Sequence, residues 1–125
     1  MLINLKTNKK TNLIAVANIL STSNNILINI SDLSNKTIYF GSSGLLGIKG
    51  SRRSTSYAGQ SIANMLGKKL FFLGVRYLYV KIKGFGYSRY SSLKGLNLAG
   101  IKFLSILDIT PVPFNGCKPS KRRRM

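Results

Sequence analysis

Several short segments of the chain alternate hydrophobic and polar positions in the way that β-strands do. Residues 14–20, 26–30 and 37–40 are rich in aliphatic and aromatic side chains, and Ser, Asn and Asp separate them. Three short strands joined by such turns predict an antiparallel meander. Residues 75–83 alternate regularly, and residues 101–109 form a last apolar stretch. Five strands are therefore expected.

Two other segments have the spacing of amphipathic helices. Residues 56–72 follow several possible N-cap residues, and Gly74 is placed to end the helix. A second, shorter helix is expected over residues 90–98, with Leu93 and Leu96 on its apolar side. Residues 41–50 contain four glycines, so we expect a long flexible loop there.

The resulting order, β-β-β-α-β-α-β, predicts the fold class. It is a single α/β domain with a mixed five-stranded sheet and two helices. We expect the globular domain to span residues 13–110. A short polar N-terminal arm at residues 1–12 and a basic C-terminal extension at residues 111–125 flank it.

The charge of the chain is extreme for a globular protein. Twenty Lys and Arg residues face only two acids, Asp32 and Asp108, which gives a net charge of +18 in 125 residues. Internal ion pairs can neutralise at most two of these cations, and the repulsion among the rest destabilises a free compact state. A polyanionic partner is therefore expected, with nucleic acid favoured over an anionic membrane surface.

The composition offers little for catalysis or metal binding. The chain has no His and a single Cys, Cys117, and its two acids are far apart in the sequence. A general acid/base pair needs two titratable groups at one site, and the glycine-rich segments lack the Lys of a phosphate-binding loop. We expect no enzyme activity, no cofactor, no metal and no small-molecule substrate, and structural roles for Asp32 and Asp108.

A membrane location is also disfavoured. The longest apolar run, residues 70–75, is far shorter than the roughly 20 residues that a spanning helix needs. Lys9 and Lys10 precede an apolar stretch, as in a signal peptide, but Asn18 interrupts that stretch. A first β-strand is the favoured interpretation.

Basic residues gather in three irregular segments. The first holds Lys49, Arg52 and Arg53 just before the first helix, where backbone N–H groups and Arg side chains suit phosphate. The second surrounds the Gly84–Gly86 turn and interleaves basic residues with Phe85, Tyr87 and Tyr90. These rings either stack on unpaired bases or fill the core, and the sequence does not decide between the two.

The third basic segment is the C-terminal extension, where five of the eight residues from Lys118 on are basic. Such runs are often solvated tails or localisation signals. In a chain of this charge, an extension that orders on RNA is the favoured interpretation.

Two of these segments resemble one family. Residues 47–55 read Gly-Ile-Lys-Gly-Ser-Arg-Arg-Ser-Thr, which is similar to the Gly-Phe-Lys-Gly-Ser-Arg-Lys-Ser-Thr signature of the eleventh small-subunit ribosomal protein family, universal S-eleven. Residues 108–124 resemble the ending of that family, Asp-Val-Thr-Pro-Ile-Pro-His-Asn-Gly-Cys-Arg-Pro-Pro-Lys-Arg-Arg-Arg. The chain departs from the family in the loop before Arg89, where a Pro and a Gly are missing, and it has Phe114 in place of the His.

The resemblance implies a structural protein that binds small-subunit rRNA on the platform of the ribosome, near the messenger RNA exit and the E site. It implies the seventh, eighteenth and twenty-first small-subunit proteins as neighbours. The rRNA-binding residues that it implies are Asn25, Lys49, Gly50, Ser51, Arg52, Arg53, Arg89, Asn115, Gly116, Lys118, Lys121, Arg122, Arg123 and Arg124.

The abundance of Asn, Ile and Lys, which have AT-rich codons, favours a mitochondrial origin, with a chloroplast or a bacterial cytoplasm as alternatives. A free nucleic-acid-binding module and a protein bound to anionic lipid are the competing functions. The Asn115–Gly116 pair also predicts isoaspartate formation, because Gly leaves the backbone nitrogen open to attack.

Overall fold

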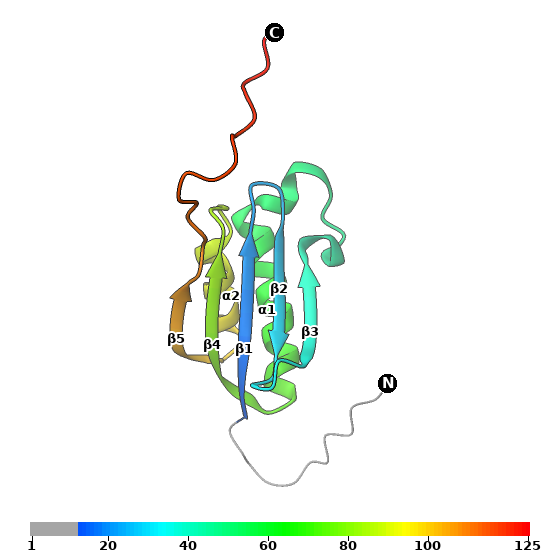
Figure 1. Cartoon of the computed structure of the whole chain (residues 1–125). Coiled ribbons are helices and arrows are strands. Elements are labelled where there is room, and N and C mark those ends of the chain that lie inside the picture. The colour runs from blue at the N-terminus through cyan, green and yellow to red at the C-terminus, as the bar shows by residue number, and fades with distance from the viewer. Residues whose placement is uncertain (1–12) are drawn as a thin grey trace.

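The computed structural model describes residues 13–125, in which one five-stranded sheet carries two helices on one of its faces (Figure 1). The predicted arm at residues 1–12 lies outside the described residues. The elements in chain order are β1 (Leu13–Ser21), β2 (Ile26–Ser31), β3 (Thr37–Ser42), the 3₁₀ helices η1 (Ser43–Leu46) and η2 (Gly50–Ser54), α1 (Ser56–Phe72), β4 (Val75–Lys83), α2 (Arg89–Leu98) and β5 (Lys102–Asp108).

The strand order is β3-β2-β1-β4-β5. The first three strands form the predicted antiparallel meander, whereas β4 pairs parallel with β1 and with β5. The prediction of a mixed α/β sheet with two helices is therefore confirmed. Strands β1, β3, β4 and β5 all end at the same edge of the sheet, which we call the C-terminal edge; strands β1, β4 and β5 begin at the opposite, N-terminal edge.

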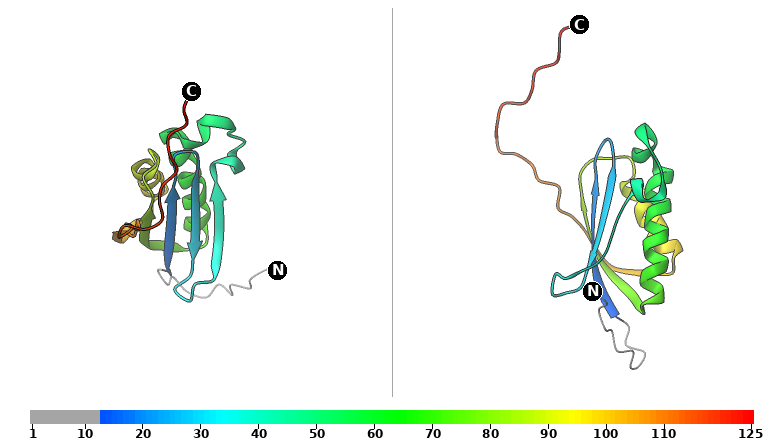
Figure 2. Two further views of the ribbon diagram at one scale, coloured as in Figure 1. Left: turned by 45° about the horizontal axis from the view of Figure 1, so that its top comes forward. Right: turned by 90° about the vertical axis from the view of Figure 1, so that its right-hand side faces the viewer.

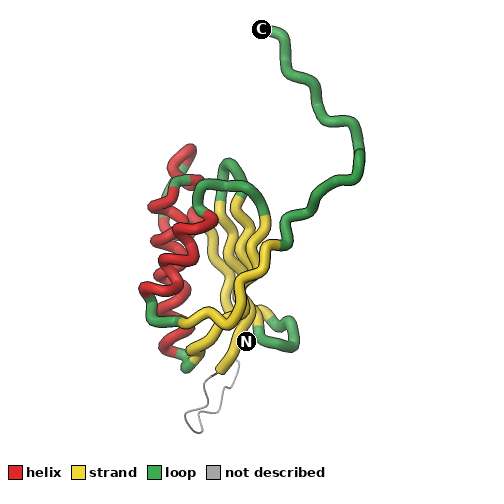
Figure 3. Tube along the Cα trace, turned by 90° about the vertical axis from the view of Figure 1, so that its left-hand side faces the viewer, coloured by secondary structure: helices red, strands yellow, loops and turns green. Residues whose placement is uncertain are grey.

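Both helices cover the same face of the sheet, as Figure 3 shows from the side. The positions that alternate inward on β1, β2 and β4 are fully buried beneath them, among them Ile19, Ile28 and Leu78. Removing apolar surface of this kind from water is worth about 25 cal/mol per Å². The opposite face carries no helix in the described chain, and Tyr79 and Lys81 are exposed on it.

Small residues let α1 and α2 approach closely. Gly59 and Gly67 on α1 face Ser88 and Ala99, and a Cβ atom built on either glycine would lie 2.6 Å from a Cβ atom of the facing residue. On α2, a Cβ at Gly95 would lie 2.4 Å from the carbonyl oxygen of Gln60. Since atoms cannot approach to these distances, larger side chains at these positions would push the helices apart.

The prediction of one long flexible loop over residues 41–50 is wrong. Strand β3 continues to Ser42, and η1 and η2 occupy most of the residues between β3 and α1. Gly47 and Gly50 have φ angles of 76° and 65°, a conformation that glycine adopts readily. The glycines therefore shape tight turns between short helices.

Neither helix within residues 13–125 is long and apolar enough to cross a bilayer.

Candidate nucleic-acid interface

The three basic segments meet at the C-terminal edge of the sheet (Figure 1). Helix η2 precedes α1 there, the 84–88 loop joins β4 to α2 there, and the C-terminal extension leaves β5 there. Segments that are up to 70 residues apart in the sequence, from Gly50 to Ser120, thus converge because parallel strands bring their ends to one edge. Figure 2 shows the extension running away from the body of the domain on the side opposite the helices.

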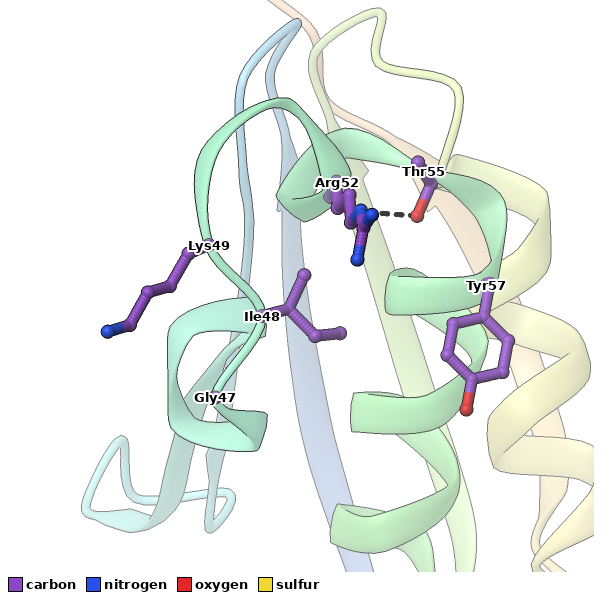
Figure 4. Close-up of a pocket in the computed structure, with 6 residues that line it drawn as sticks. All are labelled: Gly47, Ile48, Lys49, Arg52, Thr55 and Tyr57. Carbon is purple, nitrogen blue, oxygen red and sulfur yellow. Dashed lines mark hydrogen bonds between the residues drawn. The ribbon is translucent and has the colours of Figure 1, made fainter.

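Residues 47–49, helix η2 and the start of α1 line an open hollow of about 610 Å³ (Figure 4). Its lining includes Lys49 and Arg52, whose side chains are exposed. In Figure 4 the Lys49 ammonium group points outward, away from Arg52. Arg53 is half-buried, and its Nε donates a hydrogen bond to the carbonyl oxygen of Gly50 at 3.4 Å. Two of the three predicted cations of this segment are therefore free to meet an external anion.

The helix start itself is already capped. The Thr55 hydroxyl accepts a hydrogen bond from the Ala58 N–H at 3.3 Å and donates one to the Arg52 carbonyl oxygen at 2.7 Å. Thr55 thus satisfies one N–H group of α1 and fixes the end of η2 against it. Ser51 is exposed, and its carbonyl oxygen accepts a hydrogen bond from the Ser54 hydroxyl.

Tyr57 is a feature of this surface that the sequence reasoning missed. Its side chain is 76% exposed and lines the hollow across from Lys49 (Figure 4). A signal was present, because Tyr57 lies off the apolar stripe that Ala58, Ile62 and Leu66 form on α1. An exposed aromatic ring that lines the same hollow as Arg52 has the chemistry needed to stack on a base.

The 84–88 loop lies directly against the end of β1. The Gly86 N–H donates to the Ser21 carbonyl oxygen at 3.1 Å, and the hydroxyls of Ser21 and Ser88 share a buried hydrogen bond of 2.8 Å. A Cβ atom on Gly84 would lie 2.1 Å from the Ser21 carbonyl oxygen. The loop therefore requires glycine at position 84, where φ is also 95°.

The three aromatic rings of this segment point to solvent. Phe85, Tyr87 and Tyr90 are 82%, 84% and 69% exposed, respectively. The structure excludes the interpretation in which these rings fill the core, because none of them belongs to it. They are available for contact with unpaired bases.

Arg89, at the start of α2, is bound within the protein. Its Nη1 donates to the Gly84 carbonyl oxygen at 2.8 Å, and its Nη2 pairs with Asp108 at 2.7 Å. The Arg89 side chain is only 14% exposed. Its pair with Asp108 is the only ion pair among residues 13–125. Arg89 therefore has little side-chain surface to offer to RNA.

Asp108 connects this network to the C-terminal extension. Its carboxylate accepts hydrogen bonds from the hydroxyl and the backbone N–H of Thr110 at 2.6 and 3.0 Å, and the Thr110 hydroxyl also accepts the Gly84 N–H. The Thr110 hydroxyl, the Arg89 guanidinium and the Thr110 N–H together hold the pKa of Asp108 well below its usual range. The arrangement fixes the first residues after β5 against the 84–88 loop.

Asn25 also has internal partners. Its Oδ1 accepts hydrogen bonds from the Ile26 N–H at 2.9 Å and from the Ser43 hydroxyl at 2.6 Å. Asn25 thereby joins the turn between β1 and β2 to the start of η1. Asp32 accepts the Leu33 N–H at 2.7 Å in the next turn, which is the structural kind of role that we expected.

The extension from residue 111 to residue 125 is exposed along its whole length and contains neither helix nor strand. The predicted contacts that it carries are Asn115, Gly116, Lys118, Lys121, Arg122, Arg123 and Arg124. Within residues 13–125 the extension has no acidic partner, because Asp108 is paired with Arg89 and Asp32 lies in the β2–β3 turn. Its five cations are therefore open to an external polyanion.

Known proteins are similar to this chain over most of its length, including the segments described above. A model of the family "Ribosomal protein S11" matches residues 15–124. The small ribosomal subunit protein uS11 of Ruthia magnifica subsp. Calyptogena magnifica is 42% identical over 120 residues, which are 96% of this chain and 94% of that protein.

Two proteins named small ribosomal subunit protein uS11m are similar as well. The one from Marchantia polymorpha is 46% identical over 105 residues, 84% of each chain. The one from Prototheca wickerhamii is 44% identical over 110 residues, 88% of this chain and 86% of its own. The family match includes β2 to β5, both helices and the extension through Arg124.

Proposed function

The chain belongs to the ribosomal protein S11 family and is a structural component of the small ribosomal subunit rather than an enzyme, and we propose that the C-terminal edge of its sheet binds small-subunit rRNA. The resemblance inferred from residues 47–55 and 108–124 is thus confirmed. The proposal adds which part of the fold makes the contact and which residues carry it.

One observation carries this proposal. The cations of η2 and of the extension lie at one edge of the fold, and the acid nearest to them, Asp108, is occupied by Arg89 and Thr110. Uncompensated cations beside exposed aromatic rings match the two chemical features of RNA, its phosphates and its unpaired bases. Binding there also relieves the repulsion that a net charge of +18 imposes on the free chain.

The predicted contact residues divide into two groups by what they touch. Lys49, Ser51 and Arg52 are exposed, and they lie on η2 or just before it. The residues of the extension are exposed as well. We assign both sets to direct rRNA contact. Gly50 and Gly116 keep the backbone accessible. Arg53 bonds to Gly50 and retains part of its surface.

Arg89 and Asn25 form the second group. Arg89 bonds through Nη1 and Nη2, and Asn25 through Oδ1, to neighbouring segments of the protein. We assign them a positioning role. Arg89 fixes the 84–88 loop and the first residues after β5, and Asn25 fixes the start of η1. They affect rRNA binding through the shape of the edge.

The resemblance further supports a place on the platform, near the messenger RNA exit and the E site. The seventh, eighteenth and twenty-first small-subunit proteins are the proposed neighbours. The Marchantia and Prototheca relatives carry the mitochondrial form of the name, whereas the Ruthia relative is bacterial. The AT-rich residue usage favours the mitochondrion, so we propose the mitochondrial ribosome over a chloroplast or a bacterial cytoplasm.

Sedimentation of an organelle lysate in high salt tests the proposal. Affinity that comes only from counterion release falls steeply with salt, so loosely held basic proteins leave the subunit. We expect this chain to remain with the small subunit, and crosslinks from Arg52 and the extension to map to rRNA. Recovery of the chain at the top of the gradient would show that it is not an integral component of the subunit. Retention on anionic vesicles after ribonuclease treatment would favour the lipid-bound alternative.

A further inference from the structure

The opposite, N-terminal edge of the sheet carries a second patch of aromatic and basic side chains. It consists of Lys68, Phe71 and Phe72 at the end of α1 and Arg76 at the start of β4. None of these residues belongs to the rRNA contacts proposed for the C-terminal edge. Phe72 is 93% exposed and Phe71 is 42% exposed.

Arg76 and Phe71 form a fixed unit. The Arg76 guanidinium carbon lies 3.7 Å from the centroid of the Phe71 ring, and its Nη1 donates to the Phe71 carbonyl oxygen at 2.8 Å. The ring is also close to Gly100, where a Cβ atom would lie 3.2 Å from it. The stacked guanidinium is therefore held in place at the surface before any ligand arrives.

Capping of α1 accounts for only part of this patch. A guanidinium that binds the last carbonyl groups of a helix, and lysines in its last turn, are favourable for the helix alone. That explanation leaves Phe72 unexplained, because a Phe ring that is almost fully exposed adds nothing to the core or to the cap. Lys68 lies one turn before Phe72, so an exposed cation and an exposed ring share one face of the helix.

The surroundings favour a polyanion over an apolar protein partner. Lys69 on α1 and Lys102 at the start of β5 add exposed cations at the same edge. Asp32, the acid at this end, is in the β2–β3 turn, and that hairpin projects away from the helices (Figure 2).

We infer that this patch is a second rRNA site, in which an unpaired base stacks on Phe72 while Lys68 and Arg76 hold its phosphates. The inference rests on the proposed function and extends it. Helix α1 has 17 residues, so at about 1.5 Å per residue it separates the two sites by roughly 25 Å. The domain then holds two rRNA segments at a fixed distance from each other.

Photocrosslinking in assembled small subunits tests the inference. Phe72→benzoylphenylalanine replaces a ring that is 93% exposed, so the fold should be unaffected. Phe114→benzoylphenylalanine, in the extension, reports on the first site, because Phe114 is 98% exposed. Leu33→benzoylphenylalanine is the matched control, since Leu33 is 60% exposed at the same end of the sheet but next to Asp32.

We expect rRNA adducts from positions 72 and 114, at different places in the rRNA sequence, and none from position 33. If position 114 gives rRNA adducts while position 72 gives protein adducts or none, the second site is overturned and the first site remains. If neither position reaches rRNA, the proposed function fails as well. Equal rRNA adducts from positions 33 and 72 would also overturn the inference, because general proximity to rRNA would then explain both.

A charge variant supplies an independent readout. Lys68→Gln should lower the slope of log affinity against log salt, for the chain and transcribed small-subunit rRNA, by about 0.7 to 0.9. Lys36→Gln removes an exposed cation from the β2–β3 turn and should leave the slope unchanged. Identical slopes for the Lys68→Gln variant and the unmodified chain would overturn a phosphate contact by Lys68.

Discussion

Arg52 and Arg89 carry the same charge and both match the family motifs, yet the structure predicts opposite effects of replacing them. Arg52 is exposed on η2, whereas the Arg89 side chain is 14% exposed and bound to Gly84 and Asp108. We therefore expect Arg52→Gln to weaken RNA binding and Arg89→Gln to destabilise the fold. Each substitution removes one positive charge, so the change in overall repulsion is the same in both variants.

The stability loss in Arg89→Gln follows from its hydrogen bonds. The shorter, neutral Gln cannot reach both partners, and a hydrogen bond from a charged donor contributes about 1.5–3 kcal/mol. The bond to the Gly84 carbonyl oxygen is the main loss, because the Asp108 side chain is 52% exposed and solvent screens its pairing. We expect a loss of about 2 kcal/mol, or roughly 8 °C in Tm at about 4 °C per kcal/mol.

The binding loss in Arg52→Gln follows from counterion release. Each neutralised phosphate contributes about 0.7 to 0.9 to the slope of log affinity against log salt. Because the Arg52 side chain is exposed and has no acidic partner among the described residues, one full contact should be lost. A surface substitution of this kind changes stability by no more than about 0.5 kcal/mol.

Two measurements on the same purified chains separate the effects. Thermal unfolding followed by circular dichroism gives Tm, and titration of transcribed small-subunit rRNA at several salt concentrations gives the slope. Lys36→Gln, an exposed cation in the β2–β3 turn, controls for the loss of one charge. The reasoning is refuted if Arg89→Gln keeps its Tm and lowers the slope as much as Arg52→Gln does.

Three further predictions concern helix packing, pH and the extension. Gly95→Ala gains about 1 kcal/mol in helix propensity but overpacks against the Gln60 backbone at a cost of about 1–3 kcal/mol, so its Tm should fall, whereas that of Lys94→Ala on the exposed side should not. Because the pKa of Asp108 is lower in the folded chain, its stabilisation is present above the unfolded value of about 3.9 and is lost as pH falls further. Asp108→Asn should therefore flatten the dependence of Tm on pH below about 4, and an unchanged dependence would contradict this. Asn115, which has a φ of 53° and precedes Gly116 in the exposed extension, should accumulate isoaspartate, and peptide mapping that finds only Asn would reject this.

The sequence by itself determined the elements and the class of partner. Alternation with a period of two marks the strands, and the 3.6-residue stripe of α1 marks the helix, because each pattern reflects which side of one element is buried. The order of these elements restricted the fold to a mixed sheet with two helices. The net charge of +18 pointed to a polyanion, and residues 47–55 and 108–124 identified the family.

Local patterns were less informative where glycine dominates. Residues 41–50 looked like one flexible loop, but β3 and the two 3₁₀ helices account for most of them. Glycine lacks a side chain that could report burial, so periodicity gives no signal there. Its positive φ at Gly47 and Gly50 is a consequence of the turns that surrounding packing requires.

Only the tertiary structure decided which cations face outward. Arg89 meets Asp108 across 19 residues of sequence, and the Gly84 and Gly86 turn packs on Ser21 from a distant strand. Such contacts depend on the strand order, in which parallel pairing brings the ends of β1, β4 and β5 together. A side chain's charge is fixed by its residue type, but whether that charge is spent inside the protein or offered to RNA is set by the segments that folding places beside it.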